Sequence, residues 1–379
     1  MTNIRVLEMI DRPFLGGGQA VCLSLAKNLD RTKFDISVCA QDGGPLADEV
    51  RKAGLSFIPV PFGKKFRRGL VKTIAEILRT NRIDILHTHG GIAGFYGRRA
   101  AKKAGTMVVV HTLHGIHYLH YRNVFLKYAH IALERWCSRF SDAVIFVSEA
   151  DFEKGKKLRL AAEARMHLIK NGVDFSASLG SHDFRQRAEE LRRRLKLFPP
   201  VVGTVARLHR QKGVVYLLRA AEQIHKRRPE AKIVVVGGGE LEKQLRREAR
   251  IKGIDGYFLL LGERKDAREL LSLFDVFVLP SLWEGLPLVL IEAAAMGKPI
   301  IATDIEGVRE AIIDGENGIL VAPKNPEKIA AAVIRLLGNS ADAGRLGERA
   351  KSDIPARFTL SRMIAETQAL YFELAKKES

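Results

Sequence analysis

The most informative segment of the sequence is P-S-L-W-E-G-L-P-L-V-L-I-E-A-A-A-M-G-K-P, from Pro280 to Pro299. It follows V-F-V-L at 276–279, an apolar run that is typical of a buried strand. Pro287 suits the first turn of a helix, because that position needs no amide hydrogen. Gly297, with a proline two residues later, suits the end of the helix. The stretch therefore predicts a strand, a short loop and a helix over about 287–296.

Two carboxylates mark the predicted helix, with seven residues between them. Glu284 precedes the helix, and Glu292 lies inside it between L-V-L-I and A-A-A-M, where an isolated charge needs a partner or a ligand hydroxyl. At about 1.5 Å per helical residue the carboxylates lie roughly 10–12 Å apart, close to the separation of a hexose from a ribose across a diphosphate. The backbone amides of Leu288, Val289 and Leu290 lie between them at a helix N-terminus, which suits phosphate. This segment is therefore suited to bind a whole nucleotide-sugar.

The two glutamates lie within W-E-G-L-P-L-V-L-I-E-A-A-A-M-G-K-P-I-I-A-T, with P-S before it and D-G-E-N-G after it. This pattern resembles the signature of the retaining GT-B glycosyltransferases, glycosyltransferase family 4. H-T-H-G-G-I-A-G-F-Y-G-R-R-A-A and H-T-L-H-G-I-H resemble the branch that builds polysaccharide and lipopolysaccharide. The resemblance spans nearly the whole chain and implies an α/β protein with the GT-B fold, in which two Rossmann-like, doubly wound parallel-sheet domains face each other across a cleft.

Both halves of the chain alternate short apolar strands with helical stretches, the pattern of an open parallel sheet. A strand is predicted over 4–10, a glycine-containing loop over 12–19 and a helix over 20–29. The predicted organisation is an acceptor-side domain at 1–178, a nucleotide-sugar-binding domain at 179–355 and a terminal helix at 356–379. The resemblance implies that this helix crosses back to the first domain.

Composition excludes several classes of protein. The chain of 379 residues suits two domains, and its content of 46% hydrophobic and 28% charged residues is that of a globular protein. Its apolar runs are too short to cross a bilayer, and the N-terminus enters a strand instead of a signal peptide. Three scattered cysteines fit a reducing cytosol. We therefore expect a cytoplasmic protein, with peripheral attachment to the inner face of the membrane left open.

The formal net charge of +19 indicates an anionic partner. The cations gather in three runs, Lys64–Lys72, Arg98–Lys103 and Arg192–Lys196. The first run mixes cations with aromatic and aliphatic side chains, which suits an anionic membrane surface, although solvated helix faces would explain each run separately. No helix-turn-helix, zinc-finger or stacking-aromatic pattern accompanies the charge, so nucleic acid is not expected as a partner.

Transfer of a sugar from a nucleoside diphosphate leaves negative charge on the diphosphate, which fixed cations can neutralise. The run G-T-V-A-R-L-H-R-Q-K-G-V supplies Arg207 and Lys212 after the first strand of the second half. It resembles the family's R-L-x-x-x-K-G motif, whose arginine and lysine bind the diphosphate, while two ordinary surface cations are the alternative. Because these cations can neutralise the diphosphate, the resemblance implies no metal ion. It also implies no cofactor, because the nucleotide-sugar donor is a substrate.

The resemblance assigns further residues to the site. T-L-H-G resembles the family's T-x-H-G, which places His114 at the reacting face of the donor sugar. Glu284 is expected to bind hydroxyls of the transferred sugar, and Glu292 to accept the ribose diol. The implied catalytic residues are His114, Arg207, Lys212 and Glu284. The implied substrate-binding residues are Gly17, Gly18, Gly262, Arg264, Gly285, Leu286, Leu288, Val289 and Glu292.

Glycines and histidines support these assignments less specifically. The triplet Gly16–Gly18 can bring backbone amides close to phosphate, and Gly262–Arg264 matches where the family holds the base. A metal site is weighed for the histidines at 87–120, because His-x-His on a strand puts both rings on one face. No cysteine joins them, so ordinary buried histidines are preferred and no metal is predicted. The roles of His111, His117 and Glu310 stay open.

The resulting hypothesis is a retaining, metal-independent glycosyltransferase. It would move a hexose from a nucleoside-diphosphate sugar, UDP-linked in preference to GDP-linked, to a hydroxyl of a lipid-linked or surface-glycan acceptor. One rival is a nucleotide-sugar epimerase or hydrolase of the same fold. Another is a basic, non-catalytic protein that binds membranes or polyanions.

Overall fold

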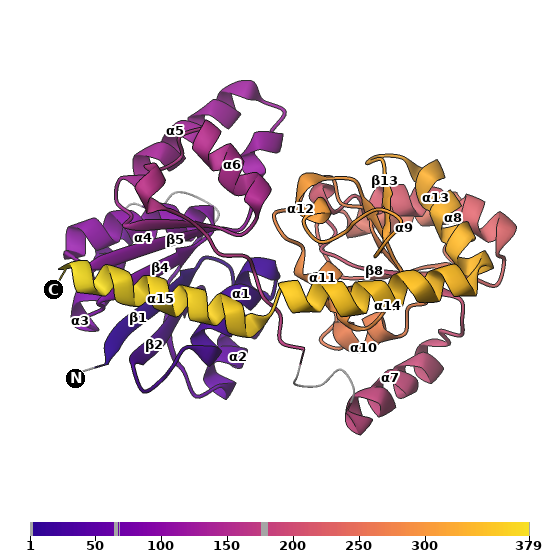
Figure 1. Ribbon diagram of the computed structural model, residues 1–379, viewed down its shortest axis with the longest axis horizontal. Helices are drawn as coiled ribbons and strands as arrows, with labels where there is room; N and C mark the ends of the chain where they lie inside the picture. Colours follow the sequence, from indigo (N-terminus) through magenta and orange to yellow (C-terminus); the bar gives the residue numbers. More distant parts are fainter. Residues whose placement is uncertain (1–2, 64–66, 68, 176–180, 379) are drawn as a thin grey trace. The chain divides into compact units, whose positions relative to one another are not determined.

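The computed structural model describes residues 3–63, 67, 69–175 and 181–378 (Figure 1). The chain forms two compact units. The first consists of Met1–Gly172 with Leu360–Ser379, and the second of Val173–Thr359. The boundary predicted at 178 falls outside the described residues. The segment that belongs to the first unit again starts at Leu360, four residues after the predicted start of the terminal helix.

The sheet of the first unit has seven parallel strands in the order β3-β2-β1-β4-β5-β6-β7. The strands are β1 (Ile4–Ile10), β2 (Phe34–Ala40), β3 (Ser56–Pro59), β4 (Ile85–His89), β5 (Val108–Leu113), β6 (Ala143–Phe146) and β7 (Met166–Leu168). The strand order reverses between β1 and β4, so the sheet is doubly wound. Sheets of this kind bind ligands at the carboxyl ends of the strands beside the reversal.

Helices cover both faces of this sheet. On one face, α3 (Leu70–Thr80) and α4 (Gly91–Ala104) pack on apolar side chains of β1 and β4. On the other face lie α1 (Gly17–Asn28) and the last helix of the chain, α15 (Leu360–Glu378), drawn in yellow along the sheet in Figure 1. The other helices of this unit are α2 (Pro45–Lys52), α5 (Val124–Ser138) and α6 (Glu149–Lys157).

The sheet of the second unit has six parallel strands in the order β10-β9-β8-β11-β12-β13, with its reversal between β8 and β11. The strands are β8 (Val201–Val205), β9 (Lys232–Val236), β10 (Phe258–Leu260), β11 (Val276–Leu279), β12 (Ile300–Thr303) and β13 (Ile319–Val321). The helices are α7 (His182–Leu195), α8 (Val214–Arg227), α9 (Glu242–Ile251), α10 (Ala267–Ser272), α11 (Leu288–Ala295), α12 (Glu306–Arg309), α13 (Pro326–Gly338) and α14 (Ser340–Arg357). The prediction of two doubly wound parallel sheets is confirmed.

The helix predicted at about 287–296 is α11, and it ends just before Gly297, as the glycine predicted. Gly297 follows it with a φ of 66°, a left-handed conformation that favours glycine. The prediction for α1 was wrong at its start, because the helix begins at Gly17 instead of Ala20. The Ala20 amide donates to the Gly16 carbonyl at 2.8 Å and closes the first turn. Glycine is a poor helix former, which is why the triplet looked like loop.

Within the described part of the chain, the helices are too short or too polar to span a lipid bilayer.

Candidate active site

The second unit brings Lys212 and Glu284 together. Lys212 ends the short turn at Arg210–Lys212 after β8, and its Nζ lies 2.5 Å from Oε1 of Glu284. Ser281 donates to the same oxygen at 2.6 Å, and Gln211 donates to Oε2 at 3.4 Å. The Glu284 side chain is 7% exposed. The carboxylate is therefore held by three donors at the ends of the two strands beside the reversal.

Two glycines allow close backbone contacts with the loop that carries Glu284. A Cβ atom on Gly213, which has a φ of 60°, would lie 2.0 Å from the Pro280 carbonyl oxygen. A Cβ atom on Gly307 would lie 2.0 Å from the carbonyl oxygen of Gly285. Sequence reasoning did not assign these roles, although Gly213 directly follows Lys212 in the motif quoted for it. Backbone contact between separate loops leaves no pattern in the sequence beyond the glycine itself.

Glu292 has the partner that its position in the helix required. Arg268, the second residue of α10, donates to Oε1 of Glu292 from Nε at 3.0 Å and from Nη2 at 2.7 Å. Both bonds use the same carboxylate oxygen. The second oxygen, Oε2, is therefore not engaged by Arg268, and it can accept hydroxyl donors from a ligand.

Two of the three backbone amides predicted to bind phosphate at the start of α11 have no acceptor within the helix. Leu288 and Val289 are the first two residues of the helix, so their N–H groups have no acceptor within it. The Leu290 amide donates to the Pro287 carbonyl at 3.1 Å, so the prediction that it is free was wrong. Gly285 and Leu286, just before the helix, are buried.

The other predicted residues of the second unit lie on loops that follow strands. Arg207 is exposed on the loop between β8 and α8, five residues before Lys212. Gly262 follows β10 with a φ of 71°, and its carbonyl accepts the Gly237 amide at 2.8 Å. Arg264 donates to both carboxylate oxygens of Asp266, at 2.7 and 2.6 Å. This bidentate contact lowers the pKa of Asp266, so the pair is a charged one at neutral pH.

In the first unit, His114 immediately follows β5. Its ring lies against Gly18 of α1, where a Cβ atom would lie 3.1 Å from Cδ2 of the histidine. Gly17 is exposed, with open space where a side chain would stand. The structure thus brings together His114 and Gly18, which lie far apart in sequence and were both predicted for the site.

A buried polar network continues inward from His114. Nε2 of His114 lies 3.0 Å from Nδ1 of His89, and Nε2 of His89 lies 2.6 Å from Oε2 of Glu8. Tyr371 of α15 donates to Oε1 of Glu8 at 2.8 Å, and its hydroxyl oxygen lies 2.6 Å from Nδ1 of His87. Sequence reasoning missed Glu8 and Tyr371. The one available signal was Glu8 itself, a lone acid in the apolar strand I-R-V-L-E-M-I.

The network sets the charge states of its members. Burial alone would raise the pKa of Glu8, but the charge of His87 and the bonds from His87 and His89 outweigh it and lower the pKa below its usual range. Burial, helped by the charge of His87, lowers the pKa of His89 to about 4. Burial also lowers the pKa of His114 well below its usual value, and the neighbouring histidines add to this. At neutral pH we therefore assign an ionised Glu8 beside neutral His89 and His114.

His111, whose role was open, points to the opposite face of the sheet. Its Nδ1 lies 2.8 Å from the Thr88 hydroxyl, and it is buried near Arg98 and Glu134. Arg98 and Glu134 form a buried ion pair, with 2.7 Å between Nη1 and Oε1. His111 is therefore a core residue on the α4 side and does not join His114. His117 is exposed on the short turn after β5.

Among the described residues, Glu8, Cys22 and His89 have side-chain atoms that all lie within 4.8 Å of one another, as a metal site requires. Their chemistry does not favour one. The Glu8 and His89 atoms are bonded to each other, and burial raises the pKa of the Cys22 thiol well above its usual value. A neutral thiol is a poor metal ligand, so this cluster is best described as a hydrogen-bonded network.

The chain matches known glycosyltransferases along most of its length. Residues 15–177 match the family model Glycosyltransferase Family 4, and residues 199–339 match Glycosyl transferases group 1. The chain is 28% identical over 384 residues to the UDP-Gal:alpha-D-GlcNAc-diphosphoundecaprenol alpha-1,3-galactosyltransferase of Escherichia coli, covering 98% of each protein. It is 29% identical over 355 residues to the alpha-D-kanosaminyltransferase of Streptomyces kanamyceticus, covering 86% of this chain and 89% of that protein.

Solved structures show the same fold. The Anabaena protein HepE, solved with UDP and glucose, superimposes with a TM-score of 0.83 at 21% identity, covering 98% of this chain and 100% of that one. The sucrose-phosphate synthase of Thermosynechococcus elongatus gives a TM-score of 0.79 at 21% identity, covering 99% of each chain. Two doubly wound parallel sheets, the Lys212–Glu284 cluster and matches to both family models have one common explanation: the chain belongs to the family 4 (group 1) glycosyltransferases of the GT-B fold.

Proposed function

We propose that this glycosyltransferase moves a hexose from a UDP-sugar to a hydroxyl of a lipid-linked acceptor during assembly of a surface glycan. The observation that carries the proposal is the cluster of Lys212, Ser281 and Gln211 on Glu284. The choice of UDP over GDP is supported by the name of the Escherichia coli relative and by the UDP in the HepE structure. The diphosphoundecaprenol in the relative's name supports a lipid-linked acceptor.

The residues of the second unit suit the donor. Lys212 and Arg207 supply two positive charges on one loop, and these would stabilise the charge that develops on the leaving diphosphate. Glu284 carries the ionised oxygens that accept hydroxyls of the sugar. Glu292, with Oε2 not engaged by Arg268, would accept the ribose diol. The amides of Leu288 and Val289 would donate to a phosphate oxygen.

The proposal includes retention of the anomeric configuration and independence from divalent ions. In this mechanism the acceptor hydroxyl attacks the face that the diphosphate leaves, and a departing phosphate oxygen takes the hydroxyl proton. The cations of Arg207 and Lys212 supply the positive charge that a metal ion would otherwise supply. No cofactor takes part in it, because the donor carries its own leaving group.

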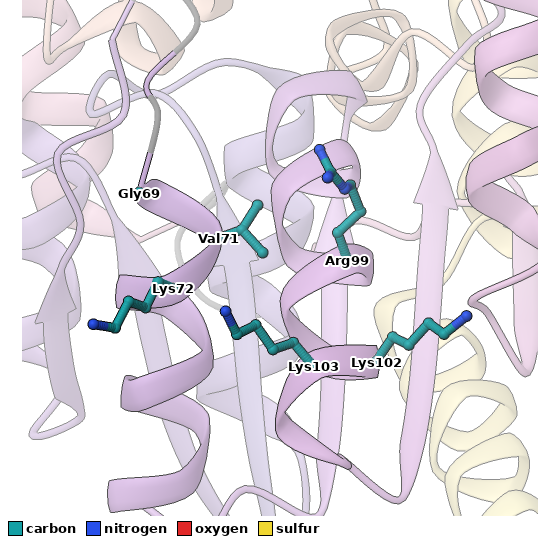
Figure 2. A pocket seen from close by; sticks show the side chains of 6 residues that line it. All are labelled: Gly69, Val71, Lys72, Arg99, Lys102 and Lys103. Atoms are coloured by element: carbon teal, nitrogen blue, oxygen red, sulfur yellow. The ribbon is translucent and has the colours of Figure 1, made fainter.

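We also propose that the first unit associates with an anionic membrane, where a lipid-linked acceptor would lie. A hollow of about 590 Å³ lies between α3 and α4. Figure 2 shows its lining, which is Gly69 just before α3, Val71 and Lys72 from α3, and Arg99, Lys102 and Lys103 from α4. Four cations around one hollow suit phosphate groups of lipid heads. Of the run predicted at Lys64–Lys72, residues 64–66 and 68 lie outside the described residues.

Apolar side chains on α5 extend this surface. The exposed apolar residues at and near α5 are Tyr121, Val124, Phe125, Leu126, Tyr128, Leu133 and Trp136. Arg99 of the hollow lies 5.6 Å from the centroid of the Trp136 ring, which joins the two regions. Exposed aromatic residues next to cations are typical of helices that lie in a membrane interface. Arg98, counted earlier with this basic run, is buried against Glu134 and adds nothing to the surface.

The function is tested with the purified protein, a panel of UDP- and GDP-sugars and a polyprenyl-diphosphate-linked sugar acceptor. We expect release of UDP and a larger glycolipid only when one UDP-sugar and the acceptor are both present. Consumption of donor without acceptor would identify an epimerase or hydrolase instead. Failure to bind UDP in calorimetry, together with steeply salt-dependent binding to polyanions, would identify a non-catalytic binding protein. NMR of the product tests retention, and the same assay with EDTA tests metal independence.

A further inference from the structure

The hydrogen bonds among the buried polar groups of the first unit can be assigned donors and acceptors in turn, starting from Glu8. Glu8 is ionised and can only accept, so the Tyr371 hydroxyl donates at Oε1 and His89 donates from Nε2 at Oε2. The Tyr371 oxygen then accepts a hydrogen bond from the N–H group at Nδ1 of His87. Nε2 of His87 lies 2.7 Å from the Thr112 hydroxyl. Every contact so far has one donor and one acceptor.

The same accounting continues from His89 to His114. Neutral His89 has its proton on Nε2, so its Nδ1 is bare and must accept from Nε2 of His114 at 3.0 Å. Neutral His114 then has its proton on Nε2 and a bare Nδ1. Glu8 thereby determines, through one intervening ring, which nitrogen of His114 is an acceptor.

The bare nitrogen of His114 is also the one that the protein leaves unused. Nδ1 of His114 is buried and has no hydrogen-bond partner among the described groups. Buried polar atoms in native proteins are almost always paired, so this atom is one to which a ligand hydroxyl can supply the hydrogen bond. The ring itself is restrained on two sides, because it stacks on His89 with 17° between the planes and lies against Gly18.

We infer that Glu8 and His89 are positioning residues, which fix the tautomer of His114 so that its Nδ1 accepts a hydrogen bond from a hydroxyl of the transferred sugar. The identity of the ligand in this inference rests on the proposed function, whereas the tautomer does not. Tyr371 donates to the second oxygen of Glu8, Oε1, while Oε2 accepts from His89.

The tautomer is tested directly in the unaltered protein. Nitrogen-15 NMR of histidine-labelled protein without ligand, at neutral pH, distinguishes protonated from bare ring nitrogens. We expect the proton on Nε2 in His89 and His114 and on Nδ1 in His87. A proton on Nδ1 of His114 would overturn the inference, whatever the enzyme proves to transfer. Absence of turnover with every nucleotide-sugar would overturn the proposed function and leave this measurement standing.

Glu8→Gln tests whether the relay acts on the reaction. The Tyr371 hydroxyl still donates at Oε1, so the glutamine keeps its oxygen there and turns its NH₂ group towards His89. His89 must then carry its proton on Nδ1, and His114 must carry its own on Nδ1 as well. The acceptor offered to the sugar becomes a donor. The expected NMR result is a proton on Nδ1 of His114 in this variant.

Donor analogues that each lack one hydroxyl supply the kinetic readout. In the unaltered enzyme, loss of the hydroxyl bound by His114 should lower kcat/KM roughly two- to tenfold, as loss of one neutral hydrogen bond does. In Glu8→Gln that hydroxyl must turn and accept from Nδ1 of His114 instead of donating to it, so the analogue penalty should differ from that of the unaltered enzyme. An unchanged analogue penalty and an unchanged tautomer in this variant would show that Glu8 has only a structural role.

Two variants control for stability. Glu134→Gln changes a buried, ion-paired glutamate on the opposite face of the same sheet, and it should keep both the tautomer and the analogue penalty. Tyr371→Phe removes one bond to Glu8 but leaves the Glu8–His89 contact, so it should also keep them. If either control shifted the His114 tautomer as Glu8→Gln does, the specific relay would be refuted.

Discussion

Nζ of Lys212 lies 2.5 Å from Oε1 of Glu284. The cation expected at the diphosphate and the carboxylate expected at the sugar therefore form an ion pair. A donor that engages both must share this contact or replace it with bonds of its own. The pair keeps each charge oriented before the substrate arrives, which is the kind of preorganisation that electrostatic catalysis requires.

Lys212→Ala is expected to lower kcat by about 10²–10³-fold, because it removes one preorganised positive charge at the leaving group. The measurement is the rate of UDP release in the presence of acceptor. Arg210→Ala is the matched control, since Arg210 is an exposed cation on the same turn. Its activity should stay near that of the unaltered enzyme. Full turnover by Lys212→Ala would remove the assignment of this lysine.

Gly307→Ala is expected to destabilise the second unit by about 1–3 kcal/mol, because its Cβ would lie 2.0 Å from the Gly285 carbonyl oxygen and force the Glu284 loop to move. The free energy of unfolding in urea measures this, and UDP affinity should fall with it. Gly256→Ala is the control, since a Cβ atom there meets nothing within 4 Å. Equal stability of the two variants would contradict the close contact.

Acid should destabilise the first unit. The pKa of His89 is lowered to about 4 in the folded protein, so below its ordinary value of 6.5 the unfolded chain binds more protons than the folded one. Stability is therefore lost as pH falls from about 7 towards 4, by about 2 kcal/mol at pH 5 from this group. His114 contributes with the same sign.

Fluorescence can follow this unit separately, because the chain has two tryptophans and only Trp136 lies in the first unit. In a Trp283→Phe background, the urea midpoint of the Trp136 signal should fall between about pH 7.5 and about pH 5. A midpoint that does not change over this interval would contradict burial of neutral histidines in the unit.

Phe125→Ala should weaken binding to phosphatidylglycerol vesicles by about tenfold or more, because insertion of one phenylalanine contributes about 1.5–3 kcal/mol. Phe125 is 87% exposed on α5. Phe198→Ala, which removes an exposed phenylalanine from the second unit, should bind as the unaltered protein does. Vesicle co-sedimentation measures both, and neutral phosphatidylcholine vesicles should bind less in every case. Equal losses in the two variants would exclude α5 as the docking face.

The sequence predicted most where the information is local. The limits of α11 follow from a proline and a glycine within one segment, and the need of Glu292 for a partner follows from its apolar neighbours. The Lys212–Glu284 pair was predictable only as two members of one site. Their ion pair depends on how the loops after β8 and β11 approach each other, which Gly213 allows.

The network behind His114 could not be predicted in the same way. Tyr371 and Glu8 are 363 positions apart, and their contact depends on how the last helix packs on the first sheet. Local structure can also differ from the prediction. The Leu290 amide donates to the Pro287 carbonyl within the first turn of the helix, so it does not belong to the predicted phosphate site. Side-chain partners that depend on tertiary packing are not encoded in spacing or periodicity.

The position of α15 has a consequence for biosynthesis. The first unit begins with Ile4–Ile10 but is completed by Leu360–Glu378, so a ribosome must make the whole second unit before the first can close. Until then Glu8 lacks the Tyr371 hydroxyl, and the sheet face that α15 covers stays open. The first unit of the nascent chain therefore lacks one of its covering helices until α15 has been translated.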